Sequence, residues 1–220
     1  MTELEITTWG HSAVGFDRGG RRLLIDPGEL SDPAAIEGAD AVLITHEHAD
    51  HFSAEALSAA LRGDSDLEVW GPGPVVAQLR EADAPAERVH EATDGAGFTA
   101  AGVSVRTIGR EHAAVHPDIP RVANVAYLVD GVALHPGDSF TPIPDGISAK
   151  VLLLPVSAPW LKLAESVDYL RAVAPATVVP IHDAFLSEAG KAVADRLING
   201  LAGEIEYRRL GRGESFTLTT

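Results

Sequence analysis

The pattern of apolar and polar residues divides the chain into short strands and amphipathic helices. Apolar runs bounded by turn residues predict strands at residues 4–9, 13–17, 22–26, 41–45, 88–91, 98–100, 103–108, 123–129, 132–134, 151–154 and 177–180, with further strands at the C-terminus. Helical patterns predict helices at residues 54–61, 74–82, 165–173 and 187–197. Hairpins and helices therefore occur in both halves of the chain, and the pattern by itself predicts a mixed α and β fold.

Turn and cap residues support these boundaries. Arg18-Gly19-Gly20-Arg21 and Asp130-Gly131 are typical of tight hairpins, and Ser53 is a suitable N-cap for the helix that follows it. A chain of 220 residues is long enough for one substantial core, and we expect one domain over residues 1–220.

Potential metal ligands are concentrated after the predicted strand at residues 41–45. The segment Thr45-His46-Glu47-His48-Ala49-Asp50-His51 places three imidazoles and a carboxylate within six positions. Because side chains alternate along an extended chain, His46 and His48 should point to the same side and could hold one ion, whereas His51 should aim elsewhere. Imidazole and carboxylate are ligands that zinc, manganese and iron accept. The segment therefore predicts a divalent metal site, with ligands for two neighbouring ions, rather than an exposed turn with incidental histidines.

Three further candidates each lie after a later apolar run. His112 follows the predicted strand at residues 103–108, and Asp138 and His182 follow those at residues 132–134 and 177–180. In sheet proteins such strand ends converge on one edge, where sites are built. Taken alone, Asp138 would be interpreted as a turn residue and His182 as a satisfied loop residue, but the upstream histidines favour metal binding by both. His116 is an alternative to His112, which we prefer because it lies closer to the end of its strand.

These motifs resemble the metallo-β-lactamase-fold hydrolase superfamily. The His-x-His-x-Asp-His pattern at residues 46–51 is its most specific mark, and His112, Gly137-Asp138 and Pro180-Ile181-His182 follow in the expected order. Trp9-Gly10-His11-Ser12 and Leu24-Ile25-Asp26-Pro27 resemble the branch that includes the ascorbate-phosphate lactonases. Many relatives carry a Gly-His-Thr-type run where this chain has Arg110-Glu111-His112-Ala113. The resemblance implies an α+β fold, a four-layer αββα sandwich in which helices flank two mixed β-sheets.

The resemblance also implies the ligands of two divalent metal ions, most often zinc, with manganese or iron as alternatives. The first ion would be bound by His46, His48 and His112, the second by Asp50, His51 and His182, and Asp138 would bridge the two. Asp26 would orient a ligand or its neighbour, and His11 would lie close to the metals or face the substrate. Asp50 would also be catalytic, because it could relay a proton to the leaving group.

One loop could contribute to substrate binding. Residues 155–162 form a proline-containing loop in which Trp160 could contact a substrate and Lys162 could pair with an anion. A packed loop with a surface lysine is the more common arrangement of such a segment, and both interpretations are open at this point.

Composition limits the class of partner. The formal net charge is −15 and no Lys/Arg-rich run is present, which argues against binding to nucleic acid. The absence of cysteine excludes disulfides, thiolate ligands and a cysteine nucleophile. The N-terminal residues lack the pattern of a secretory signal, and no run approaches the ~18 apolar residues that span a bilayer. We expect a cytoplasmic protein that acts on a small molecule, without nucleic-acid or membrane partners; a homo-oligomer is compatible with the sequence.

These features together predict a metal-dependent hydrolase. Its metal-activated hydroxide would attack an ester, lactone or phosphoryl bond of a small substrate at neutral pH. Two alternatives keep the metal site: an iron-dependent, oxygen-using member of the fold and a non-catalytic metal-binding member. The ligand set argues against the second, because a structural zinc site normally closes at four ligands.

Overall fold

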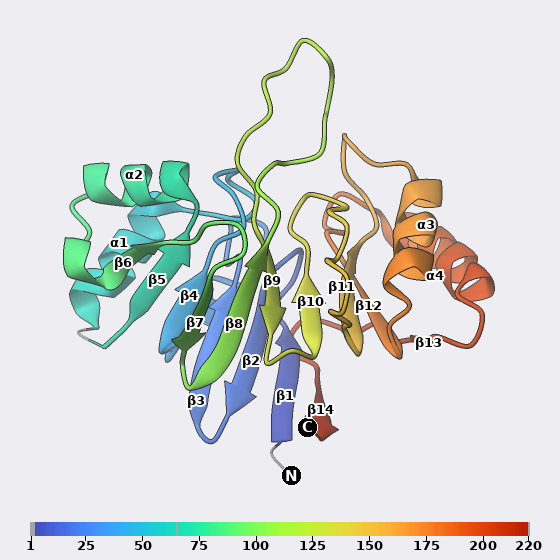
Figure 1. Cartoon of the computed structure of the whole chain (residues 1–220), viewed down its shortest axis with the longest axis horizontal. Coiled ribbons are helices and arrows are strands. Elements are labelled where there is room, and N and C mark those ends of the chain that lie inside the picture. The colour runs from blue at the N-terminus through green and yellow to red at the C-terminus, as the bar shows by residue number, and fades with distance from the viewer. Residues whose placement is uncertain (1–2, 65, 220) are drawn as a thin grey trace.

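Two mixed seven-stranded sheets form the centre of the molecule (Figure 1). The computed structural model describes residues 3–64 and 66–219. The first sheet has the order β14 (Ser215–Thr219), β1 (Glu3–Thr8), β2 (Val14–Arg18), β3 (Arg21–Ile25), β4 (Ala41–Leu43), β5 (Glu68–Gly71) and β6 (Val89–Glu91). The second has the order β13 (Glu206–Tyr207), β12 (Thr177–Ile181), β11 (Val151–Pro155), β10 (Ala133–His135), β9 (Ala126–Val129), β8 (Val103–Ile108) and β7 (Gly97–Ala100).

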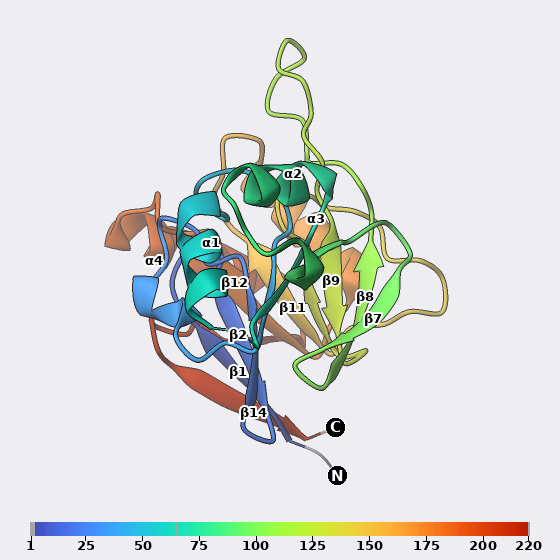
Figure 2. The same cartoon turned by 90° about the vertical axis from the view of Figure 1, so that its left-hand side faces the viewer.

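Helices cover the outer face of each sheet. Helices α1 (Ala54–Gly63) and α2 (Gly73–Glu81) pack on the first sheet, and α3 (Leu163–Val173) and α4 (Glu188–Leu201) pack on the second. Figure 2 shows α1 and α2 on the side that faces the viewer. Short 3₁₀ helices cover Pro33–Ile36 and Ala86–Arg88. The predicted αββα sandwich is confirmed by this arrangement.

Three apolar layers hold the sandwich together. Between the sheets, Phe16 and Leu43 of the first belong to the same buried cluster as Val103 and Tyr127 of the second. Two outer clusters join each sheet to its helices; they include Val42 with Leu57 and Leu79, and Leu152 with Leu170 and Ile198. Strand β4 and its neighbours are buried on both faces, which explains why they appear in the sequence as continuous apolar runs.

One predicted strand ends earlier and another begins later than the apolar pattern suggests, and in each case a polar bond is the reason. The run at residues 41–45 leaves the ladder after Leu43, because the Thr45 N–H donates to the Asp26 side chain. The run at residues 123–129 becomes a strand only at Ala126, because the Val125 N–H donates to the Thr45 carbonyl in the other sheet. Both departures lie beside the histidine cluster, where these backbone N–H groups bond to residues near the cluster instead of to a neighbouring strand.

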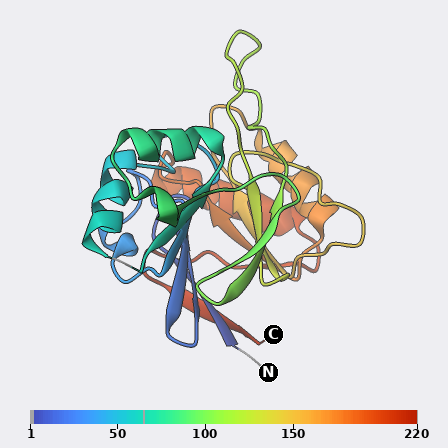
Figure 3. The ribbon, with the colours of Figure 1, turned by 60° about the vertical axis from the view of Figure 1, so that its left-hand side comes forward.

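Strand direction brings the candidate ligands to one edge. The pairing makes β1, β3 and β4 run in the same direction, and β8, β10, β11 and β12 likewise run together. The connection from β8 to β9 extends beyond the rest of the fold (Figure 1), and Figure 3 shows it at the end opposite both termini. None of the described helices is long and apolar enough to cross a bilayer.

Candidate metal centre

The predicted ligands lie in loops that leave these parallel strand ends. The segment 45–51 follows β4, and His112, Asp138 and His182 follow β8, β10 and β12 respectively. Hydrogen bonds connect the two sheets beside the site. The Tyr127 hydroxyl donates to the Ile44 carbonyl (2.8 Å), the Val125 N–H to the Thr45 carbonyl (2.9 Å), and the His182 N–H to the His11 carbonyl (2.8 Å).

The ligand atoms gather in three overlapping groups. In each group the atoms lie within 4.8 Å of one another; the groups are His46, His48 and His112; His46, His51 and Asp138; and His11, Asp50, His51 and His182. Asp138 lies between the others, with Oδ1 3.2 Å from His51 Nε2 and Oδ2 3.1 Å from His182 Nε2. Its Oδ2 is also 3.5 Å from Nε2 of His112. The structure therefore brings together all seven predicted ligands, and His11 lies with Asp50, His51 and His182.

Five buried ligand atoms in this cluster have no hydrogen-bond partner among residues 3–64 and 66–219. They are Nε2 of His46, His51, His112 and His182, and Oδ1 of Asp138. The contacts between them are close, but they lack hydrogen-bond geometry. Leaving a buried polar group unpaired costs about 1–3 kcal/mol each. Five such atoms that converge on one place fit a metal centre, since a cation supplies the missing partner to all of them.

The opposite ring nitrogen of these histidines is already held. Nδ1 of His112 donates to the Ala113 carbonyl (2.6 Å), and Nδ1 of His182 donates to the Ser157 carbonyl (2.5 Å). Such bonds place the proton on Nδ1 and leave Nε2 with a free electron pair for a metal.

Asp26 fixes the orientation of the histidines in the segment that follows β4. Its carboxylate accepts from Nδ1 of His51 (2.7 Å) and from both the N–H (2.7 Å) and the hydroxyl (2.6 Å) of Thr45. The Thr45 hydroxyl proton is thereby used, so Nδ1 of His46 must donate to the Thr45 oxygen, 2.9 Å away. Asp26 thus orients one histidine directly and a second through Thr45.

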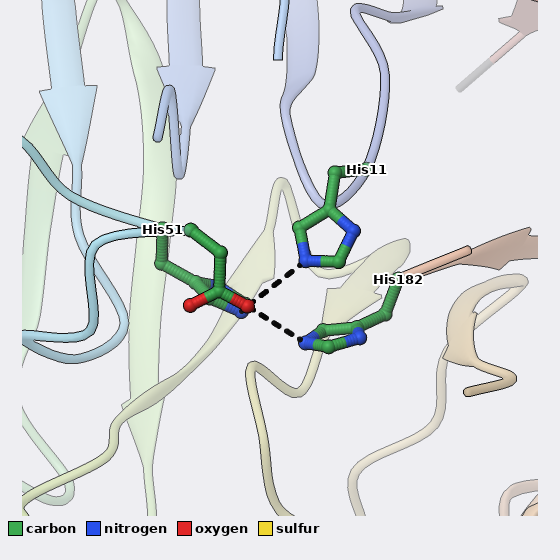
Figure 4. Close-up of side chains that lie close together, drawn as sticks. His11, His51 and His182 are labelled. Atoms are coloured by element: carbon green, nitrogen blue, oxygen red, sulfur yellow. Dashed lines mark hydrogen bonds and ion pairs between the residues drawn. The ribbon is translucent and has the colours of Figure 1, made fainter. Parts of the chain in front are cut away.

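His11 has the opposite proton arrangement. The Ala184 N–H donates to Nδ1 of His11 (3.4 Å), so Nε2 carries the proton and donates to Oδ2 of Asp50 (3.1 Å). Figure 4 shows the rings of His11 and His182 turned toward the same carboxylate. In this arrangement His11 is a hydrogen-bond donor to a predicted ligand rather than a ligand itself.

Three residues of the site have a left-handed backbone. His11, Asp26 and His182 have φ values of 48°, 52° and 60°. Residues other than glycine rarely adopt this region. Each costs roughly 1–2 kcal/mol relative to ordinary backbone. Strain of this kind concentrates at functional sites, where the surrounding structure imposes it.

Carboxylates and imidazoles in the cluster shift one another's proton affinity. Burial alone would lower the pKa of His182, but the facing carboxylates of Asp138 and Asp50 outweigh it and raise that pKa to about 9. In the same way Asp138 and Asp26 overcome burial and raise the pKa of His51. Burial lowers the pKa of His46. Without a metal the His182 imidazole therefore holds a proton at neutral pH, and a bound cation would take its place.

These shifts predict how the metal-free protein responds to pH. The pKa of His182 is about 9 in the folded chain against an ordinary 6.5, so its stabilising contribution is complete below pH 6.5 and is lost as pH rises through 9. The raised pKa of His51 acts in the same direction. The melting temperature of chelator-treated protein should therefore fall across this range, whereas that of zinc-loaded protein should change less. Equal pH dependence in both forms would contradict this prediction.

His112 and His116 occupy different environments. His112 lies with His46 and His48, whereas the His116 side chain is exposed and faces Asp118. We predict that His112→Ala lowers the bound metal by at least about half and turnover by about 100-fold or more, and that His116→Ala, the matched control, leaves both within about twofold. Metal analysis of the two purified variants checks this. Loss of metal from the His116 variant alone would show that His116, and not His112, is the metal ligand in this loop.

The structure places Trp160 and Lys162 differently from one another. The Trp160 indole N–H donates to Oδ2 of Asp138 (2.7 Å), and its ring lies beside that of His112. It therefore holds the central carboxylate in place as well as reaching the cavity above it. Lys162 is exposed at the start of α3, where its main-chain N–H donates to Glu165, and it is not among the residues that line that cavity.

Two supporting residues were not singled out from the sequence. Thr45 connects Asp26 to His46, and buried Asn124 accepts from the Asp138 N–H (3.0 Å) and donates to the Pro136 carbonyl (3.0 Å). The position of Thr45 directly before the first histidine is a usable signal, because it continues the buried strand. Asn124 has no comparable signal, since it follows an irregular loop of the chain.

Comparisons with known proteins identify the family of the chain. A family model described as a beta-lactamase superfamily domain matches residues 5–182. The chain belongs to the beta-lactamase superfamily. This superfamily member is 39% identical over 197 residues to Protein Rv0786c of Mycobacterium tuberculosis, covering 86% of this chain and 89% of that protein. It is 26% identical to a UPF0173 metal-dependent hydrolase of Aeropyrum pernix, with 80% and 81% covered.

A solved structure has the same fold. Igni18, a metallo hydrolase from the archaeon Ignicoccus hospitalis, aligns with a TM-score of 0.75 over 99% of both chains at 21% identity. The family model, the curated relatives and this shared fold together confirm the resemblance to the metallo-β-lactamase-fold hydrolase superfamily that the motifs predicted.

Proposed function

We propose that this superfamily member uses two divalent metal ions to hydrolyse an ester, lactone or phosphoryl bond of a small substrate. Zinc is the metal that we propose for both ions. The observation that carries the proposal is the set of five buried ligand atoms that converge without a partner. A closed structural zinc site uses four ligands, and seven side chains gather here. That number supports two ions with positions left for substrate.

The first ion would be held by His46, His48 and His112, the second by Asp50, His51 and His182, and Asp138 would serve both. When bound, two such cations lower the pKa of water toward ~7 and polarise the bond to be cleaved. The chain's own contribution is orientation: Asp26, Thr45 and two main-chain carbonyls fix which ring nitrogen faces inward.

Asp50 is the best-placed group to move a proton. Burial would raise the pKa of its carboxyl, but the bond from His11 and the nearby imidazole of His182 outweigh it and hold that pKa well below the usual range. Asp50 is therefore ionised at neutral pH and would hold a proton only while passing it on. The side chain is partly exposed to the cavity, so it can reach a leaving oxygen. The proposal assigns to Asp50 the transfer of a proton to that oxygen, and to His11 the positioning of the carboxylate.

Elemental analysis of the purified protein, followed by a hydrolysis panel, tests the proposal. The panel should include lactones, aryl esters, phosphodiesters, phosphonates, thioesters and β-lactams, each with zinc-, manganese- and iron-loaded protein. We expect about two metal ions per chain and turnover that chelation abolishes and zinc restores. Turnover that survives complete metal removal would contradict the proposal. Oxygen uptake by iron-loaded protein would favour the oxygen-using alternative instead.

A further inference from the structure

The cavity above the histidine cluster is apolar apart from its predicted metal ligands and Glu29. It has a volume of about 370 Å³, enough for about twelve water molecules at roughly 30 Å³ each. Its apolar wall comes from separate loops that contribute Leu30, Val115, Pro159, Trp160 and Phe185. A cavity of this size fits a small molecule of about a dozen non-hydrogen atoms.

The wall holds apolar side chains where water can reach them. Phe185 and Val115 are 59% and 38% exposed, and both line this cavity. The Phe185 ring lies 5.4 Å from the ring of His11 and 6.0 Å from that of His182. Trp160 lies beside His112 instead, so the two aromatic side chains flank different parts of the cluster.

Among the described residues that line this cavity there is no Lys or Arg. Glu29 is the one charged lining residue outside the predicted metal ligands. Phosphate and carboxylate groups of substrates are usually recognised by guanidinium or ammonium groups, or by a helix N-terminus. The cavity lacks such side chains. The charge of the two proposed metal ions would be partly offset by Asp50, Asp138 and Glu29, and the formal net charge of −15 repels anions further.

Lys and Arg side chains, among them Arg212, line two neighbouring hollows and not this cavity. Arg121 lines a small neighbouring hollow beyond His48, where its side chain pairs with Glu111. Lys191 and Arg209 line a separate hollow on the other side of His11 and lie against Asp183. Arg121, Lys191 and Arg209 are engaged by carboxylates and are not directed into the cavity.

We infer that the substrate is an uncharged carbonyl compound, an ester or lactone, with an alkyl or aryl group that packs against Leu30, Val115 and Phe185. This inference rests on the proposed function. It narrows the range of substrates to uncharged carbonyl compounds and excludes phosphorylated and other anionic substrates. Hydrolysis adds water across the acyl C–O bond: the hydroxyl joins the acyl carbon, and a proton goes to the leaving oxygen.

A chain-length series of neutral esters tests the inference on zinc-loaded protein. Phenyl acetate, phenyl butyrate and phenyl hexanoate are compared with phenyl phosphate and bis(4-nitrophenyl) phosphate. We expect kcat/KM to rise at least about tenfold from acetate to hexanoate. Full burial of the four additional methylenes would raise kcat/KM by roughly 200-fold. Both phosphates should react at least about tenfold more slowly than the hexanoate.

Variants locate the effect in the cavity wall. Phe185→Ala and Leu30→Ala should each lower the hexanoate-to-acetate ratio several-fold at unchanged metal content. The matched control is Leu197→Ala, which removes an exposed leucine on α4, away from the cavity, and should leave the ratio unchanged. Metal content is measured for every variant, because Phe185 touches two histidines of the cluster.

The outcomes separate the two proposals. If phosphates are hydrolysed faster than the hexanoate, or if the ratio does not depend on chain length, the substrate assignment is overturned while the hydrolase remains. If the zinc-loaded protein hydrolyses none of the panel, the proposed function fails and the substrate assignment fails with it.

Discussion

Replacing Asp138 by alanine should remove bound metal and lower turnover by at least about 10³-fold. Asp138 is buried, and its two oxygens lie near His51 on one side and His112 and His182 on the other. Its loss would deprive both proposed ions of a shared negative ligand, and a loss of about 4 kcal/mol in transition-state stabilisation corresponds to that factor. Metal analysis and kcat/KM on the best substrate of the panel provide the measurement.

Two further variants accompany this experiment: one removes only the charge of Asp138, and the other is a control at an exposed carboxylate. Asp138→Asn keeps the size of the side chain and loses its charge, so we expect it also to bind less metal than the parent protein. Asp118→Ala removes an exposed carboxylate, 90% accessible, from the β8–β9 connection and should change neither quantity. Full metal content in the Asp138→Ala protein would rule out a bridging role for this carboxylate.

Replacing Gly28 by alanine should disrupt the second half of the metal centre more than the first. A Cβ atom at Gly28 would lie 2.1 Å from the main-chain carbon and oxygen of Asp50 and 2.3 Å from the His51 nitrogen. Backbone atoms cannot yield at such distances without moving the loop, so Asp50 and His51 must shift. We expect the bound metal to fall from about two ions per chain to about one, turnover to fall by 100-fold or more, and the melting temperature to drop by several degrees.

The control for this prediction is another glycine with space around it. A Cβ atom at Gly200, in helix α4, meets nothing within 4 Å. Gly200→Ala should therefore keep metal and turnover and raise stability by up to about 1 kcal/mol, because alanine is the better helix former. Unchanged metal content in the Gly28→Ala protein would show that the loop adapts, and that its position in the wild-type chain is not needed for the second ion.

Local chemistry made the candidate ligands predictable from sequence. The segment 45–51 concentrates ligand side chains behind an apolar strand, and His112, Asp138 and His182 each follow a strand of their own. Because parallel strands end at a common edge, residues far apart in the sequence were expected to meet, and the structure brings them together. The sandwich itself came from the family resemblance, since periodicity distinguishes helices from strands and not how sheets stack.

Other parts of the site had no sequence signal because they depend on close approach in three dimensions. The proton arrangement of His11 depends on the Ala184 N–H, 173 positions away. The cavity wall is built from single apolar residues in different loops, and such residues have no periodicity to identify them. The short distance between Gly28 and the Asp50 main chain is likewise invisible until the loops are placed.

The division of the ligands between two sheets links catalysis to the packing of the interior. Four of the seven predicted ligands follow β4, and the other three follow β8, β10 and β12. Hydrogen bonds from Tyr127 to Ile44, from Val125 to Thr45 and from His182 to His11 connect the two sets directly. A slip of a fraction of an ångström between the layers would leave each sheet intact and yet spoil the spacing of the ligands. Heat or core-weakening substitutions should therefore inactivate this protein before they unfold it, so that loss of turnover becomes an early reporter of loosening within the sandwich.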